Sequence, residues 1–176
     1  MKNLLSLICI TTLALVGCVG TPTTYYQLPN SNYQMPSSYY RIPVQLKVVL
    51  ADSLSQGNLV YQDSITTLHF AQNHLWADDL QQEITQALAN EMNKISHHYA
   101  FMPHTDNKNT LTVYISAFQG SFDGHILIKG YSQWHGRPEK GQNFDIQLPQ
   151  QGNGYNNMVK ALAQGLKEVA ASITSR

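Results

Sequence analysis

The sequence predicts an α+β fold, a two-layer sandwich in which a mostly antiparallel sheet has two helices packed on one face. Two observations support this prediction. Several short segments alternate apolar with polar residues, which is typical of strands that bury one face. Two longer segments repeat apolar residues every three or four positions, which is typical of amphipathic helices. Because each helix has a single apolar face, both most simply cover the same face of the sheet.

The expected strands have apolar side chains at every second position. Val44–Leu50 is the first long one, and shorter candidates follow it around turn residues. Asp123 and Gly124 lie between two later strand segments and are a hairpin turn signal. Residues 43–176 are expected to form a single domain. The full set of expected strands is 44–50, 59–62, 66–70, 111–117, 125–134 and 144–148.

Two helices are expected within this domain. The first is predicted at about 75–98, where Asp78 and Asp79 would lie in the first turn and complement the helix dipole. Trp76 would open this helix. It would either pack the helix entry onto the sheet or stand exposed as an aromatic anchor of an interface. The second helix is predicted at about 155–175, after a break at glycines.

The N-terminus has the form of a bacterial lipoprotein signal peptide covering residues 1–17. Its apolar run is too short to span a membrane, which needs about 20 residues. The run ends in a sequence similar to a lipobox, formed by Leu15, Val16, Gly17 and Cys18. We therefore expect cleavage before Cys18 and lipidation of its thiol. The alternative is an ordinary signal peptide with an incidental cysteine.

Residues 18–42 are expected to be the lipidated cysteine and an extended tether. The segment contains a Tyr-x-apolar-Pro pattern three times at a period of seven, and each proline excludes helix. A fully extended tether would reach up to about 70 Å. It is either a free spacer, or one of its Tyr-Tyr units docks on the domain as an edge strand. The competing units are Tyr25-Tyr26-Gln27-Leu28 and Tyr39-Tyr40-Arg41-Ile42.

Composition and motifs argue against an enzyme. The chain has 11 basic and 11 acidic residues, so it lacks the basic footprint of a nucleic-acid-binding protein. The seven histidines are scattered, with no metal-binding motif, and we expect neither a metal nor a cofactor. No phosphate-binding glycine loop or nucleophile elbow is present. A hydrolase is therefore the least favoured hypothesis.

Several segments, taken in order, resemble one family. They are the lipobox, 25–29, 59–62, 73–77, 122–124 and 155–163. Together they are similar to the PqiC family (also called YmbA) of ABC-type transport auxiliary lipoproteins, which serve Pqi intermembrane transport systems. Five aromatic and apolar residues of these segments are the candidate docking or interface residues, namely Tyr25, Tyr26, Leu28, Trp76 and Phe122.

The resemblance implies a non-catalytic lipoprotein on the inner leaflet of the outer membrane. Its implied partners are an MCE-domain protein, PqiB, whose periplasmic tube is thought to carry lipids, and a multipass membrane protein, PqiA. The lipoprotein would dock the tube to the outer membrane, as a ring of identical copies. The alternative function is a lipid-binding carrier with an apolar pocket of a few hundred Å³.

Overall fold

The computed structural model describes residues 20–36, 40–136 and 141–174. The expected signal peptide, lipobox and Cys18 lie outside these residues. The elements, in chain order, are β1 (Thr24–Tyr26), β2 (Ile42–Leu50), the short 3-10 helix η1 (Asp52–Leu54), β3 (Asn58–Gln62), β4 (Leu68–Trp76), α1 (Leu80–Ile95), β5 (Tyr99–Met102), β6 (Thr110–Ser121), β7 (His125–His135), β8 (Asn143–Pro149) and α2 (Tyr155–Thr174).

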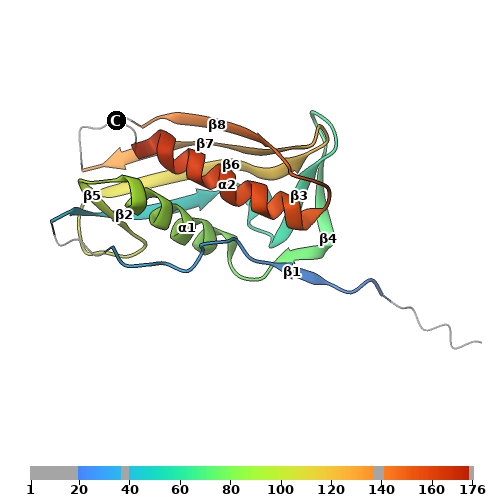
Figure 1. Cartoon of the computed structure of the whole chain (residues 1–176), viewed down its shortest axis with the longest axis horizontal. Coiled ribbons are helices and arrows are strands. Elements are labelled where there is room, and N and C mark those ends of the chain that lie inside the picture. Colours follow the sequence, from blue (N-terminus) through green and yellow to red (C-terminus); the bar gives the residue numbers. More distant parts are fainter. Residues whose placement is uncertain (1–19, 37–39, 137–140, 175–176) are drawn as a thin grey trace, which may run out of the picture.

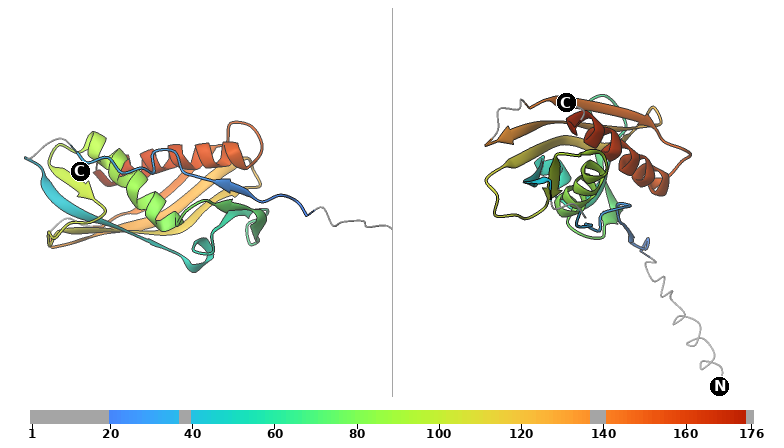
Figure 2. Two further views of the ribbon diagram at one scale, coloured as in Figure 1. Left: turned by 90° about the horizontal axis from the view of Figure 1, so that it is seen from below. Right: turned by 60° about the vertical axis from the view of Figure 1, so that its left-hand side comes forward.

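The two helices lie side by side on one face of a single sheet, as Figures 1 and 2 show. This arrangement confirms the predicted α+β class. The core lies between the layers and contains the inward side chains of the strands and one face of each helix, so that Leu46, Val113, Ile84 and Leu162 are at most 1% exposed. Burying each such side chain contributes about 1.5–3 kcal/mol. No helix in the described part of the chain is long and apolar enough to cross a membrane.

The long strand β6 organises the sheet. One of its edges pairs with β7, which pairs in turn with β8. The other edge is shared: β2 pairs along 110–115 and β3 pairs at 120–121. The two longest pairings, β6–β7 and β7–β8, are antiparallel as expected. The pairings β2–β6, β2–β5, β3–β6 and β1–β4 are parallel, because long connections return the chain to the same end of the sheet.

The first helix begins later than predicted. The segment from Leu68 to Trp76 is one strand, because it pairs with β3 on one side and β1 on the other. Helix α1 begins after Asp79, whose side chain accepts the Gln82 N–H at 2.8 Å and caps the helix. The apolar stripe of the helix starts only at Leu80 and does not include the preceding residues.

The first helix also ends earlier than predicted, at Ile95 rather than His98. Ser96 has extended backbone angles, and its hydroxyl accepts the Tyr99 N–H at 3.1 Å. The next residues form β5, a strand that is absent from the predicted set. Its pairing with β2 joins residues more than fifty positions apart, which a local pattern does not reveal.

Candidate functional site

The first Tyr-Tyr unit of the tether docks on the domain as an edge strand. Strand β1 pairs in parallel with the end of β4, so that Thr24, Tyr25 and Tyr26 lie opposite His74, Leu75 and Trp76. The described part of the second unit, residues 40–42, does not form an added strand. Its Ile42 begins β2, its Tyr40 is 99% exposed, and its Tyr39 lies outside the described residues.

The segment that follows β1 runs along helix α1, as Figure 1 shows. We call residues 24–36 the strap. Leu28 is its apolar anchor, being only 2% exposed and part of the core. Its N–H donates to Oε2 of Glu83 at 2.8 Å. The strap is therefore held both by burial of a leucine and by a hydrogen bond to a carboxylate, which is stronger than one between neutral groups.

The Glu83 carboxyl is unusual because it is almost completely buried, with 3% exposure. Burial raises its pKa above the ordinary value, and the charge of Asp78 acts in the same direction, while the hydrogen bond from Leu28 opposes them. Its Oε1 is the one buried side-chain polar atom that lacks a partner among the residues described. The hydrogen bond that holds the strap therefore requires burial of a carboxyl group with one unpaired oxygen, and this burial lowers the stability of the domain.

Asn90 holds the strap two turns further along α1. Its Oδ1 accepts the Gln34 N–H at 2.8 Å. Its Nδ2 donates to the carbonyl oxygens of Asn30 at 2.8 Å and Asn32 at 2.7 Å. The neighbouring Glu91 accepts from the Asn30 amide at 3.1 Å. Because residues seven positions apart lie on the same helix face, Glu83 and Asn90 form one polar row against the strap.

A ring cluster fixes the start of the strap. The Tyr26 hydroxyl lies 2.9 Å from Nδ1 of His74, and the His74 ring lies 4.2 Å from that of Tyr155, the first residue of α2. Burial raises the pKa of the Tyr155 hydroxyl, and the neighbouring Tyr26 acts in the same direction. These rings join β1, β4 and α2 at the end of the molecule where the chain enters.

Replacing Asn90 with alanine is expected to destabilise the domain by about 1–3 kcal/mol, because it leaves one backbone N–H and two carbonyls of the strap without their partner. Asn90→Asp should cost at least as much, since it keeps the acceptor but places a carboxylate against two carbonyls. Urea unfolding measures both. Asn157→Ala, which removes an exposed hydrogen bond to Asn153, is the matched control and should change stability by less than about 0.5 kcal/mol.

Glu83→Gln is expected to change how stability depends on pH. The pKa of Glu83 is raised in the folded state, so the folded protein holds the proton more tightly than the unfolded chain does. This adds to the free energy of unfolding below the ordinary glutamate pKa, and the addition is lost as pH rises through the raised pKa. The wild type should therefore lose stability relative to Glu83→Gln between acidic and neutral pH. Denaturant unfolding across this range measures the difference. Glu168→Gln, on the exposed face of α2, is the matched control. A constant difference for Glu83→Gln would contradict the prediction.

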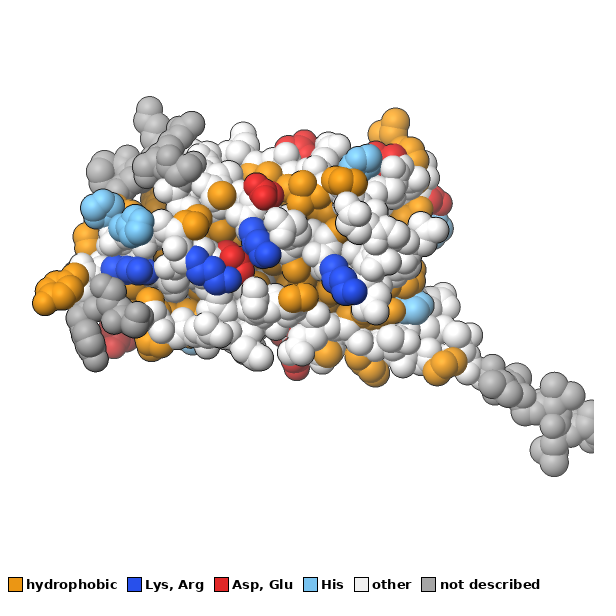
Figure 3. All heavy atoms as spheres, viewed as in Figure 1, with side chains coloured by type: hydrophobic (Ala, Val, Ile, Leu, Met, Phe, Trp, Pro, Cys, Tyr) orange, Lys and Arg blue, Asp and Glu red, His pale blue; other side chains and the backbone are white. Residues whose placement is uncertain are grey.

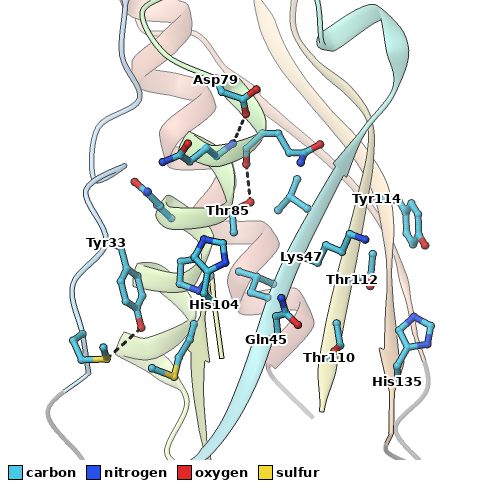
Figure 4. Close-up of a pocket in the computed structure, with 18 residues that line it drawn as sticks. Tyr33, Gln45, Lys47, Asp79, Thr85, His104, Thr110, Thr112, Tyr114 and His135 are labelled. Carbon is cyan, nitrogen blue, oxygen red and sulfur yellow. Dashed lines mark hydrogen bonds between the residues drawn. The ribbon is translucent and has the colours of Figure 1, made fainter. Parts of the chain in front are cut away.

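A groove of about 1060 Å³ lies between α1, the strap and the edge of β2 (Figure 4). Polar side chains from several elements face it, including Lys47, Thr85 and Thr112. The one carboxylate in its lining, Asp79, already caps α1. Within the described ranges, no group of three or more His, Cys, Asp or Glu residues could hold a metal ion. The groove is open, with polar and apolar surface in about equal parts, and it differs from the enclosed apolar pocket expected of a lipid carrier.

The predicted candidate residues fall into two groups. Tyr26 and Leu28 hold the strap, and Trp76 is buried at 5% exposure with its ring 6.0 Å from that of Phe118. The alternative in which Trp76 is an exposed interface anchor is therefore wrong, because the residue ends a strand between two others. Tyr25 and Phe122 are 63% and 52% exposed and remain available for contacts.

The sequence did not predict the residues of α1 that bind the strap, namely Glu83, Asn90 and Glu91. The only feature of the sequence that could have indicated them is that these polar residues lie next to the apolar stripe of the helix.

The fold of the chain is that of small α+β proteins of known structure. A crystal structure of an uncharacterized protein is 29% identical, with a TM-score of 0.77, and the match covers 88% of this chain and 98% of that one. A protein from Xanthomonas campestris has the same fold at 12% identity and a TM-score of 0.65, covering 85% of this chain and 91% of that one.

The chain belongs to the family of ABC-type transport auxiliary lipoprotein components, whose family model matches residues 26–174. It is 30% identical to the intermembrane transport lipoprotein PqiC of Escherichia coli (strain K12), over 95% of this chain and 94% of that protein. PqiC of Shigella flexneri matches equally. These similarities confirm the family resemblance seen in the sequence. The family is one of transport auxiliary lipoproteins rather than of enzymes.

Proposed function

We propose that this chain is lipidated on Cys18, anchored in the outer membrane, and docks the periplasmic tube of a PqiB-like MCE-domain protein to that membrane. A PqiA-like membrane protein would complete the system, and several copies of the chain would form a ring around the end of the tube. The observation that carries the proposal is the match to an intermembrane transport lipoprotein over nearly the whole length of both chains.

The strap sets the distance between the domain and the membrane. Thr24, the first residue of β1, follows Cys18 by only six positions. Six extended residues span at most about 20 Å, compared with about 70 Å for a tether that is free as far as residue 42. A lipid on Cys18 would therefore hold the domain against the bilayer, and the partner would have to reach the outer membrane to meet it.

The end of the domain opposite the anchor is the proposed docking end, because it would face an approaching inner-membrane partner. Ile42 and Ile95 are 41% and 46% exposed there. A hollow of about 460 Å³ beside them is lined by Tyr99, Trp134 and His98, among other residues. Exposed apolar and aromatic side chains around a hollow are typical of positions that contribute strongly to binding.

Photo-crosslinking from intact membranes tests the proposal. A photoreactive residue at Ile95, at the docking end, is expected to give an adduct that mass spectrometry identifies as the MCE-domain protein. The same residue at Ile65, at the anchor end, is the matched control and should give none. Co-purification without any adduct from Ile95, or an adduct from Ile65 alone, would contradict the assigned orientation. Absence of co-purification would contradict the docking role itself.

The carrier alternative is less favoured by the described hollows, because the hollow of about 460 Å³ beside Tyr99 and Trp134 is partly open at the surface and does not lie enclosed between the layers. The groove along α1 is open, and the space between the helices and the sheet is filled by side chains at or near zero exposure. Among the residues described, neither of the two larger hollows gives a phospholipid tail a fully enclosed apolar volume.

A further inference from the structure

We propose that two hairpin turns beside the anchor, carrying Ile65 and Phe122 at their tips, insert into the headgroup region of the membrane and orient the domain on it. The inference rests on the proposed lipid anchor at Cys18 and adds to it a second, non-covalent membrane contact. The occupant of this surface is the bilayer itself, and the observations that support this are the placement of the turns, their exposure and their charge.

Strand pairing places both turns at the same end of the molecule. Strands β3 and β6 are parallel neighbours, with Tyr61 opposite Gly120 and Gln62 opposite Ser121. The turn after β3, at 63–67, therefore lies beside the turn after β6, at 122–124. Figures 1 and 2 show both turns at the end of the sheet from which the N-terminal chain leaves.

The direction of β1 brings the lipid to this same end. Strand β4 runs back from the 63–67 turn, and β1 is parallel to it. The chain that precedes Thr24 is therefore directed toward the turns. Because Cys18 is at most about 20 Å from Thr24, acyl chains on it would hold this end, and not another, at the bilayer surface.

The turns expose apolar side chains at positions where turns in contact with water usually have polar residues. Ile65 is 84% exposed and Phe122 is 52% exposed. Leu68 and Phe70, on the strand that leaves the first turn, are each 39% exposed, and Tyr25 is 63% exposed. Apolar and aromatic side chains of this kind are favoured at the boundary between headgroups and acyl chains.

The charges at this end fit an uncharged or zwitterionic lipid surface. No Lys or Arg occurs in 57–80 or in 118–128. Each turn has one acidic residue paired with a histidine: Asp63 lies 2.5 Å from His69, and Asp123 lies 3.3 Å from His125. In Figure 3 the visible Lys and Arg side chains lie over the body of the domain. Insertion would therefore be driven by apolar contact, without attraction to anionic lipid, and should be insensitive to salt.

Fluorescence quenching in vesicles tests the inference on the lipidated full-length protein. Cys18 is the only cysteine after the expected cleavage, and its thiol would carry lipid. Ile65→Cys and Phe122→Cys therefore add a single reactive thiol for an environment-sensitive dye. Tyr40→Cys, which is 99% exposed at the opposite end, is the matched control. In phosphatidylethanolamine–phosphatidylcholine vesicles containing brominated acyl chains, the dye at 65 and 122 should be quenched about twofold or more relative to 40.

A second set of variants tests whether the native side chains, and not the attached dye, draw the turns into the bilayer. With the dye at Thr66→Cys, quenching is expected to fall when Ile65 and Phe122 are both changed to serine, because the native side chains would no longer draw the turns into the bilayer. Both positions are exposed, so these changes should leave the fold intact. Quenching at all three positions should persist in high salt.

The outcomes separate this inference from the proposed function. If the protein floats with the vesicles but the dye at 65 and 122 is no more quenched than at 40, the inference is overturned and the lipid anchor stands. If the fluorescence of the dye at 65 and 122 changes only when the MCE-domain protein is added, the turns belong to a protein interface, and the inference is also overturned. If the protein does not float at all, both the anchor and the inference fail.

Discussion

The Cys18→Ala variant is expected to appear in the soluble periplasmic fraction instead of the membrane fraction, with loss of transport function. The acyl chains are the main source of membrane affinity, since each buried methylene contributes about 0.8 kcal/mol, and no helix in the described part of the chain can span a bilayer. Two exposed turns would supply too little apolar area to replace them. The shift between fractions should therefore be nearly complete.

The same variant should fold normally. The first described contact with the domain is made by β1, six positions after Cys18. Its melting temperature should match that of the wild type, and fractionation and thermal denaturation together measure the two effects. The variant should be exported behind a signal peptide that does not require lipidation, so that an uncleaved leader cannot act as an anchor.

Cys9→Ala is the matched control for the Cys18 experiment. Cys9 is the only other cysteine of the chain and lies in the segment expected to be removed. The substitution should leave membrane association and activity unchanged. Retention of Cys18→Ala in the outer membrane, or release of Cys9→Ala, would show that the anchor has been assigned to the wrong residue.

Much of the fold could be predicted because strict local patterns encode it. The alternation at 44–50 and 111–117 corresponds to β2 and the first part of β6, and the predicted second helix matches α2 within one residue at each end. These segments have one buried face, and burial imposes a period of two or 3.6 on the sequence. The predicted start of α1 is five residues too early, because Leu75 and Trp76 are apolar and extend the apolar pattern of the helix toward the N-terminus. The observed boundary is set by the Asp79 side chain, which caps the helix.

The candidate site was harder to predict because its contacts are distant in sequence. The Tyr-Tyr unit and its leucine were recognised as able to dock, but two units were equally suitable. The choice depends on Glu83, which is 55 positions from Leu28, and on Asn90, which is 56 positions from Gln34. No spacing rule links residues so far apart. Parallel pairing of β1 with β4 is likewise set by tertiary structure and not by the local pattern.

Replacing Leu28 with alanine is expected to give the largest loss of stability among the substitutions considered, about 2–5 kcal/mol, because it removes most of a leucine that is 2% exposed and leaves a cavity beside α1. For a domain of this size, such a loss lowers the melting temperature by roughly 10 °C. Thermal and urea denaturation measure it. Leu28→Met, which conserves volume, should cost less than about 1.5 kcal/mol.

Tyr25→Ala is the matched control on the same strap, since its side chain is 63% exposed. A loss of stability for Leu28→Ala no larger than that for Tyr25→Ala would mean that the strap is not part of the cooperative fold.

The Leu28 variant also separates anchoring from positioning. A strap released from α1 would lengthen the link between Cys18 and the domain from about 20 Å to as much as about 70 Å. The lipid would still hold the protein in the membrane fraction, but the domain would no longer be held at a fixed height. We therefore expect Leu28→Ala to float with vesicles while losing both the quenching at position 65 and the crosslink from position 95. Retention of both signals in a destabilised but membrane-bound variant would show that the strap contributes only to stability. Loss of both signals, in a variant whose circular dichroism shows a folded domain at the assay temperature, would show that the buried leucine sets the height at which a partner meets the domain.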